Sequence, residues 1–298
     1  MAFTTLTLDV QSRELKKVYV ETAKASGTTY NPLFNETDID RTYELVKALG
    51  PFGAFTYRGE FGDSVEDTRL QHYVQTITTE NWSKKWRSSW QNEKENPMNS
   101  AKDNVRQATY AKFKTMDTIA FNVLNRAFST SYLGPDGDPL VDADHLWYGG
   151  SSTYSNYETA AALSEATLET AIQNARDAED ARGMPLMYKG SFKLVVPSAL
   201  AFKAMKLKRA ITAPESDNGA PNVVGADITV MVSPYLTDTN AWFLVPDVAE
   251  YNPLHMYWFN RGYMNTDVNT EGDREFVMGF QTKTFWTSPI LLRGNEGA

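Results

Sequence analysis

The clearest periodic pattern of apolar residues lies within residues 98–129. Apolar side chains recur there at three- and four-residue spacing, which places them on one face of a helix. The stripe consists of Met116, Ile119, Ala120, Val123, Leu124 and Ala127. Ser100, followed three residues later by Asp103, forms a capping pattern at its start. At 1.5 Å per residue, about 30 residues extend roughly 45 Å, so the pattern predicts a long helix that forms a spine.

The second half of the chain mixes helical and strand patterns. A helix is expected over residues 164–182, where Leu163 and Leu168 are placed as a hydrophobic staple. Gly183 would end that helix in the left-handed conformation. Strand patterns follow at residues 192–196, 227–232, 241–245 and 274–286, with a short helix over residues 199–209. Helices and strands do not alternate strictly, which favours an α+β fold over a doubly wound parallel sheet.

The first 50 residues predict two short helical pieces separated by a polar loop at residues 26–32. Leu15, Val18 and Tyr19 are spaced for the first piece. The second piece would begin at Asp38 or Asp40 and end at residues 50–51, a Gly-Pro pair. Such short pieces bury little apolar surface of their own. We therefore expect an arm that lies on other structure.

Residues 51–97 combine glycine, aromatic and β-branched residues. A strand is expected over residues 70–79, and a turn at residues 80–81 would start a return strand. That strand would place Trp82, Trp86 and Trp90 on one face, although a helix would align them too. The β-branched stretch ahead of them favours a hairpin. Two strands alone are marginal in water, so we expect the hairpin to lie on a neighbouring subunit.

Composition excludes several classes of protein. The 298 residues contain no cysteine, which rules out disulfides, thiolate zinc sites, iron–sulfur clusters and a cysteine nucleophile. A net charge of -8 argues against a protein that mainly binds phosphate backbones, although a local basic patch stays possible. The longest apolar run, residues 241–246, is far shorter than the ~20 residues of a membrane helix, and the start lacks a secretion signal. The default compartment is the cytoplasm.

Residues 136–145 hold four aspartates and one of the three histidines of the chain. A hard cation would accept such ligands, but Leu140 and Val141 stand where a calcium loop needs an oxygen ligand and a glycine. The alternative is a surface turn built from Asp, Gly and Pro. The histidines at positions 72, 145 and 255 show no metal-binding spacing.

No other pattern predicts catalysis, because the nucleophile-elbow and phosphate-loop motifs are absent. Lys84, Lys85 and Arg87 alternate with tryptophans and could bind a single nucleic-acid strand. The alternative is a solvated cationic face opposite a packed tryptophan face. We therefore expect no enzyme, no cofactor and no metal.

A series of short motifs resembles one family. In chain order they are Asp136-Gly137, Pro139-Leu140, Asp144-His145, Asn156, Leu163-Ser164, Gly183-Met184-Pro185, Leu194-Val195-Val196-Pro197 and the segment Val232-Ser233-Pro234-Tyr235-Leu236-Thr237-Asp238-Thr239-Asn240-Ala241-Trp242-Phe243-Leu244. Together they resemble tailed-bacteriophage major capsid proteins, in particular Mu-like major head subunits. The resemblance is strongest over residues 133–245.

The resemblance implies the HK97-like capsid fold, an α+β fold with an N-terminal arm, an extended β-hairpin called the E-loop and a long spine helix. It implies an arm over residues 1–50, the E-loop over 51–97, a peripheral domain over 98–132 and 253–298, and an axial domain over 133–252. Tyr57, Arg58, Glu60, Trp82, Trp86 and Trp90 are the expected contacts between subunits.

The implied function is self-assembly as hexamers and pentamers into an icosahedral phage head around double-stranded DNA, without sequence-specific binding. The expected place is the virion, with assembly in the host cytoplasm. The arm follows Met1 at once, so we expect a separate scaffold protein, together with a portal and in some cases a decoration protein. An encapsulin-like compartment is the same-fold alternative, and a metal-dependent hydrolase using residues 136–145 is the alternative from another class.

Overall fold

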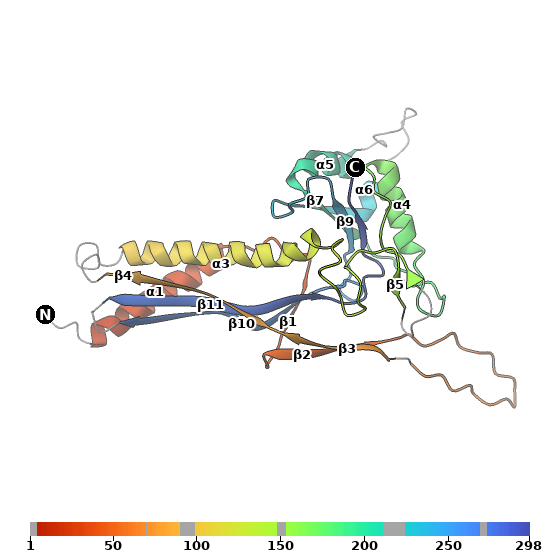
Figure 1. Ribbon diagram of the computed structural model, residues 1–298, viewed down its shortest axis with the longest axis horizontal. Helices are drawn as coiled ribbons and strands as arrows, with labels where there is room; N and C mark the ends of the chain where they lie inside the picture. Colours follow the sequence, from red (N-terminus) through yellow and green to blue (C-terminus); the bar gives the residue numbers. More distant parts are fainter. Residues whose placement is uncertain (1–4, 70, 90–98, 148–152, 211–223, 269–272) are drawn as a thin grey trace.

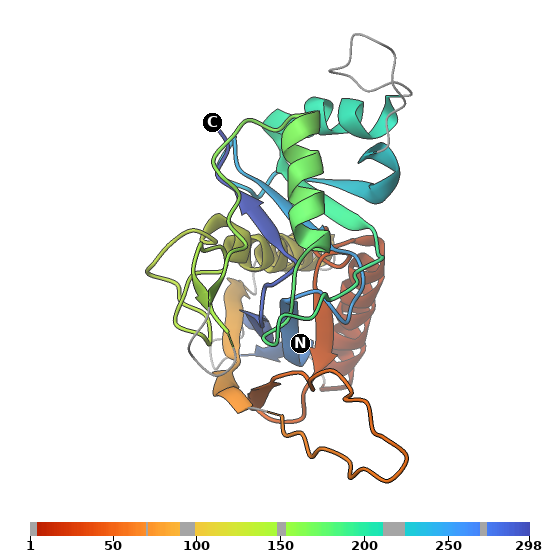
Figure 2. The same cartoon turned by 90° about the vertical axis from the view of Figure 1, so that its right-hand side faces the viewer.

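The structure is a computed structural model that describes residues 5–69, 71–89, 99–147, 153–210, 224–268 and 273–298. Figure 1 shows two parts, an elongated lobe built on long strands and an upper lobe that stands on one end of it. A two-stranded extension projects beyond both lobes, and Figure 2 shows its loop pointing away from the upper lobe. None of the described helices combines the length and the apolar composition that a membrane span requires.

The elongated lobe is built on a four-stranded sheet in the order β1-β10-β11-β4. The strands are β1 (Asn35–Asp38), β10 (Leu254–Val268), β11 (Arg274–Trp286) and β4 (Glu80–Ser88). Strand β1 pairs with β10 in parallel, and the other pairs are antiparallel. The predicted long strand over residues 274–286 is therefore confirmed, and it is a central strand of this sheet.

Helix α3 (Asn99–Asn125) is the predicted spine, and it lies along the sheet (Figure 1). Its first half packs with α1 (Thr5–Ala25) and the sheet in one apolar cluster. That cluster comprises Leu15, Val18, Ala101, Val105, Met264, Phe276 and Met278. The second half of α3 joins the lobes, because Phe121 and Leu124 share a core with Met256 of β10 and Phe243 of the upper lobe. The first predicted helical piece is thus confirmed as α1, lying on the spine.

The second predicted helical piece is wrong. Residues Tyr43–Leu49 form strand β2, which pairs antiparallel with β3 (Gln71–Thr78). A helix there would have been an isolated short piece, and most helical stability comes from tertiary packing of one face. As a strand, the segment forms a ladder with β3, and Val46 packs beside buried Ile39 and Ile77.

The predicted hairpin between residues 70–79 and their return strand is also wrong in its pairing. Strand β3 pairs with β2, whereas β4 pairs with β11. Only Thr79 separates β3 from β4, and the chain continues in one direction from one sheet into the next (Figure 1). In this pairing Trp82 and Trp86 stand opposite Phe280 and Phe276. The extended hairpin of the fold is therefore β2–β3 with the loop of residues 50–70.

The upper lobe follows the prediction closely. Its sheet has the order β12-β9-β7-β8, and three helices flank it. The strands are β7 (Phe192–Pro197), β8 (Ile228–Ser233), β9 (Trp242–Pro246) and β12 (Arg293–Asn295); the helices are α4 (Glu165–Arg176), α5 (Ala201–Arg209), which follows a 3-10 turn (Ser198–Leu200), and α6 (Val224–Asp227). All five residues of β9 are buried. A small pair, β5 (His145–Leu146) and β6 (Thr153–Tyr154), lies between the lobes.

Two predictions about α4 need correction. Its start is as expected, because the Ser164 side chain accepts a hydrogen bond from the backbone N–H of Thr167 in a capping box, and Leu163 and Leu168 are both buried. The helix ends at Arg176, earlier than residue 182. Gly183 has a φ of 73° but belongs to a separate turn, where its N–H donates to the Asp180 carbonyl.

Candidate functional site

The loop that joins β2 to β3 exposes large apolar side chains to an unusual degree. Phe55, Tyr57 and Phe61 are exposed by 107%, 95% and 93%, and Val65 by 71%. Single exposed apolar residues are ordinary, but a group of them on one projecting loop is typical of an interaction surface. Tyr57 is one of the predicted contact residues, so the structure places it where a partner could cover it.

The tip of this loop is a tight turn. The Gly62 N–H donates to the Gly59 carbonyl, 3.1 Å away, and the Arg58 guanidinium donates to the Gly62 carbonyl. Glu60 lies within the turn and is exposed. The turn therefore presents Arg58 and Glu60, two predicted contact residues of opposite charge, together at the end of the extension.

The base of the loop is tied to the upper lobe. An Asp67 carboxylate oxygen accepts the Gly53 N–H at 2.7 Å, and Asp67 lies 3.0 Å from the Arg182 guanidinium. Arg182 also donates to the Thr68 carbonyl at 2.9 Å. The Gly53 hydrogen bond, with Arg182 beside it, lowers the pKa of Asp67 below its usual range. These contacts fix the direction of the extension while its tip stays uncovered by its own chain.

The three predicted tryptophan contacts differ in environment. Trp86 is half-buried and stacks on Phe276, with ring centroids 5.2 Å apart and planes at 7°. Trp82 is 39% exposed and lines a cavity of about 240 Å³ between α3 and strands β4 and β11. Trp90 lies outside the described residues. Trp82 is thus available to a partner, whereas Trp86 packs largely within its own subunit.

The cationic side chains beside these tryptophans are partly neutralised. Lys85 and Arg87 approach the Glu275 carboxylate at 2.5 and 2.6 Å. The Lys85 contact, with Arg87 close by, lowers the pKa of Glu275. Two of the three cations proposed for single-strand binding therefore already have an acidic partner, which favours the solvated salt-bridged face.

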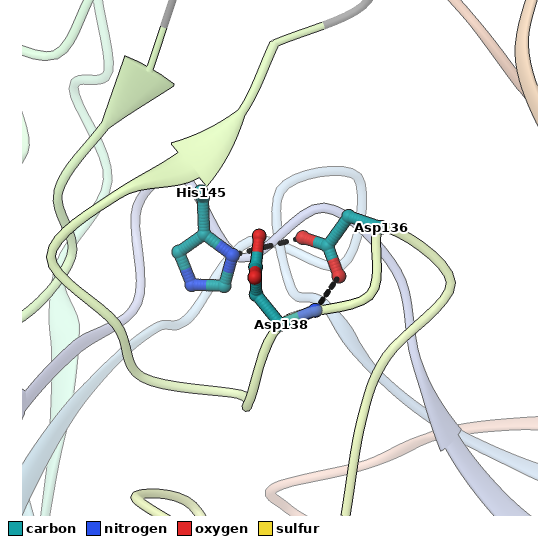
Figure 3. Close-up of side chains that lie close together, drawn as sticks. All are labelled: Asp136, Asp138 and His145. Carbon is teal, nitrogen blue, oxygen red and sulfur yellow. Dashed lines mark hydrogen bonds and ion pairs between the residues drawn. The ribbon is translucent and has the colours of Figure 1, made fainter. Parts of the chain in front are cut away.

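The acidic loop gathers some of the predicted ligands. His145 is fully buried and its Nδ1 lies 2.8 Å from an Asp136 carboxylate oxygen, while the other Asp136 oxygen accepts the Asp138 N–H at 3.3 Å (Figure 3). Ligand atoms of Asp136, Asp138 and His145 lie within 4.8 Å of one another, near enough for one cation to contact all three. Burial, and then the charge of Asp136, raise the pKa of Asp138.

The other two aspartates of this loop form a separate arrangement. Asp142 accepts the Ala143 and Asp144 backbone N–H groups at 2.6 and 3.3 Å. A hydrogen bond with Asp142, and then the charge of Asp142, raise the pKa of the exposed Asp144 carboxyl. Asn156 fixes the loop, because its side chain accepts the Asp142 N–H at 2.8 Å and donates to the Leu140 carbonyl at 2.8 Å. The loop is thus a hydrogen-bonded connection between the lobes. Asp136 pairs with His145 Nδ1, whereas His145 Nε2 and one Asp138 carboxylate oxygen are buried without a hydrogen-bond partner among the described residues.

The sequence model of the phage capsid protein family matches residues 73–287 of this chain. The chain therefore belongs to the phage capsid protein family. A search of curated proteins finds no significant match.

Solved capsid structures share the fold along nearly the whole chain. The cyanophage P-SCSP1u capsid aligns with a TM-score of 0.60 at 13% identity, covering 91% of this chain and 88% of that one. The procapsid of bacteriophage JBD30 aligns with a TM-score of 0.57 at 11% identity, covering 98% and 76%. A virus-like particle from Pyrococcus furiosus gives 0.58 at 11% identity, covering 95% and 98%. The predicted α+β, HK97-like capsid fold is confirmed, whereas the finer likeness to Mu-like subunits stays a prediction.

Proposed function

We propose that this chain is a major capsid protein, whose subunits form hexamers and pentamers that close into an icosahedral phage head around double-stranded DNA. The observation that carries the proposal is the β2–β3 extension. It is held at its base by Asp67 and Arg182 and exposes Phe55, Tyr57 and Phe61 along its loop. A loop that is tied at its base and carries uncovered aromatic side chains gains stability when a neighbouring subunit covers it.

The two lobes suggest how the subunit is divided. The elongated lobe with α3 and β11 would be the peripheral domain, the upper lobe the axial domain, and α1 with β1 the N-terminal arm. The E-loop would then begin at β2, earlier than residue 51, and the C-terminal strand β12 would belong to the axial sheet, because it pairs with β9.

The proposed contacts between subunits are Tyr57, Arg58 and Glu60 at the tip of the extension, and Trp82, Trp86 and Trp90 along and beyond β4. Exposure favours the first three and Trp82. Trp86 would contribute the part of its ring that Phe276 does not cover. Aromatic and arginine side chains carry much of the binding energy of protein interfaces.

The role is structural, and no catalytic step is proposed. The net charge of -8 suits a shell that encloses DNA without binding it tightly. We propose a scaffold, a portal and in some heads a decoration protein as partners, with assembly in the host cytoplasm. The encapsulin-like alternative is the weaker one, since the family match is to phage capsids.

Negative-stain electron microscopy of the purified chain, alone and with its scaffold, tests the proposal. Closed shells of uniform diameter are expected. Light scattering that shows only monomers under all conditions, with scaffold present, would contradict it. Cargo enzymes recovered inside shells made without any phage partner would favour the encapsulin-like alternative.

A further inference from the structure

Helix α5 of the upper lobe exposes a face that is both apolar and basic. Phe202, Met205, Lys206 and Arg209 follow the spacing that puts residues on one side of a helix. Phe202 is 81% exposed and Met205 42%, while Ala204 and Leu207 on the inner side are buried. The helix carries four basic and no acidic residues, and within the described part of the chain none of these four forms an ion pair.

The opposite side of the upper lobe carries a cavity of about 590 Å³. Its inner wall includes Trp147, Tyr154 and Ile290, and the Arg293–Glu158 ion pair lies beside them at 3.8 Å. The turn that follows α4, residues 177–183, forms another wall. In Figure 1, α5 stands on the left of the upper lobe, and α4 stands on the right.

The turn of residues 177–183 is acidic and rigid. Asp177, Glu179 and Asp180 line the cavity. Backbone hydrogen bonds close the turn, from Asp180 N–H to the Met184 carbonyl at 2.8 Å and from Leu186 N–H to the Ala178 carbonyl at 3.0 Å. The two arginines at the ends of the turn form ion pairs with carboxylates outside it: Arg176 with Asp227 and Arg182 with Asp67, each at 3.0 Å. Among the described residues, Asp177 and Glu179 form no ion pair.

We infer that α5 of one subunit docks into this cavity on the next copy of the chain, with Phe202 entering the aromatic wall and Lys206 and Arg209 meeting Asp177 and Glu179. The inference rests on the proposed function, because it names the contact that would build the capsomer ring. Both sides of the contact are present on every subunit and differ from each other, so the interface is heterologous, and such an interface forms a ring when the rotation between successive copies closes. Opposite charges also steer the two faces together and fix their register.

A nucleic-acid strand is the other occupant that a basic helix could accept. It would account for the lysines but not for the acidic cavity across the lobe, nor for Phe202 and Met205 lying among the cations. A second copy accounts for both faces at once. The cavity is large enough for an aromatic ring and the side chains beside it.

Paired cysteines test the contact directly, because the chain has no cysteine of its own. Phe202→Cys combined with Ala181→Cys should give, in oxidised shells, a ladder of disulfide-linked chains that ends at the hexamer. Either cysteine alone should give no ladder. Phe202→Cys with Val20→Cys, an exposed residue of α1, is the control pair and should also give none.

Charge reversal provides a second readout. Lys206→Glu with Arg209→Glu should lower the yield of assembled particles at least about tenfold, the effect of losing one well-placed contact. Adding Asp177→Lys and Glu179→Lys in the same chain should restore the yield. The same change of charge on α1, Lys16→Glu with Lys24→Glu, should leave it within about twofold, as expected for surface charges away from a contact.

The outcomes separate this inference from the proposed function. Suppose that shells form, that the cysteine pair gives no disulfide ladder, and that charge reversal on α5 does not change the yield of particles. That result would overturn the docking of α5 and leave the capsid role intact. If charge reversal on α5 changes only the amount of DNA that the shells retain, the docking of α5 would also be overturned, and nucleic acid would be the occupant of this face. Failure of the unmodified chain to form any particle would contradict the capsid role itself.

Discussion

The upper lobe and the β2–β3 extension differ in how far they bury their own apolar side chains. In the upper lobe every residue of β9 is buried, and α4 begins in a complete capping box. The extension has two strands, and its loop exposes Phe55, Tyr57 and Phe61 almost fully. An isolated pair of strands is marginal in water. We therefore expect the upper lobe to be stable in a lone subunit and the extension to gain stability when a neighbouring subunit covers it.

The largest expected loss of stability lies where the two lobes meet. Phe243 of β9 is 1% exposed and stacks on Phe128, with centroids 5.6 Å apart. Phe243→Ala should lower the free energy of unfolding by about 3–5 kcal/mol, because it removes a large side chain from a closed core. Urea denaturation of the subunit measures this. A loss below about 1 kcal/mol would show that the junction is loosely packed.

Trp86 and Trp82 lie on the same strand but differ in burial, so the same contrast between buried and exposed side chains can be tested within β4. Trp86→Ala should cost about 2 kcal/mol, since it removes the stack on Phe276 and the contacts to the α1–α3 cluster. Trp82→Ala should cost under about 1 kcal/mol and act mainly on assembly. Denaturation and light scattering of both variants test this. Equal losses of stability would contradict the different roles assigned to them.

Lys112 of α3 predicts how stability depends on pH. Lys112 is 8% exposed, and its ammonium donates to the Tyr19 hydroxyl at 2.8 Å and the Arg261 carbonyl at 2.6 Å. Burial lowers the pKa of Lys112 from 10.5 to about 8. Between these values the unfolded chain binds more protons than the folded one, so stability should rise with pH above about 8.

The useful window for that measurement ends near pH 10. Burial raises the pKa of Tyr19, so ionisation of the unfolded tyrosine opposes the trend above that point. Lys112→Met should flatten the slope between about pH 8 and 10. An unchanged slope in this variant would show that another group controls it.

The smallest expected effect on stability belongs to the extension. Phe55→Ser, Tyr57→Ser and Phe61→Ser together should change the free energy of unfolding by no more than about 0.5 kcal/mol, since these side chains touch little of their own subunit. Assembly should nevertheless fail. Val20→Ser on α1, 46% exposed, is a matched control that should assemble normally. Loss of stability in the triple variant would mean that the loop is part of the subunit core.

Local signals decided which elements could be predicted. The apolar stripe of α3 and the capping serine of α4 are features of neighbouring residues, so both helices could be predicted. Helix α4 follows Ser164 as expected, whereas α3 already contains Ser100, the residue expected to cap it, and ends at Asn125 rather than at residue 129. The sequence pattern does not predict strand β10, because two register shifts between Trp258 and Tyr263 break its alternation. Gly262 has a φ of 154° there, a conformation that other residues rarely adopt, and a Cβ would also displace the Lys112 ammonium and the Tyr19 hydroxyl.

The pairing of strands that lie far apart in the chain could not be predicted from the sequence. Strand β2 looked helical because its partner β3 begins more than twenty residues later, and β4 looked like the partner of β3 because it follows directly. For the same reason exposure could not be assigned: the tryptophan pattern did not distinguish Trp82 from Trp86, whose environments depend on β11 and the α1–α3 cluster. Tyr57, Arg58 and Glu60 lie on the loop of the extension, and their role as contacts between subunits stays a prediction.

Electron cryomicroscopy of assembled particles tests the central claim most directly. We predict an icosahedral shell in which residues 50–69 of each subunit lie against an adjacent subunit, with Phe55, Tyr57 and Phe61 covered. Particles in which this loop folds back on its own subunit, or preparations with no closed particles, would contradict it.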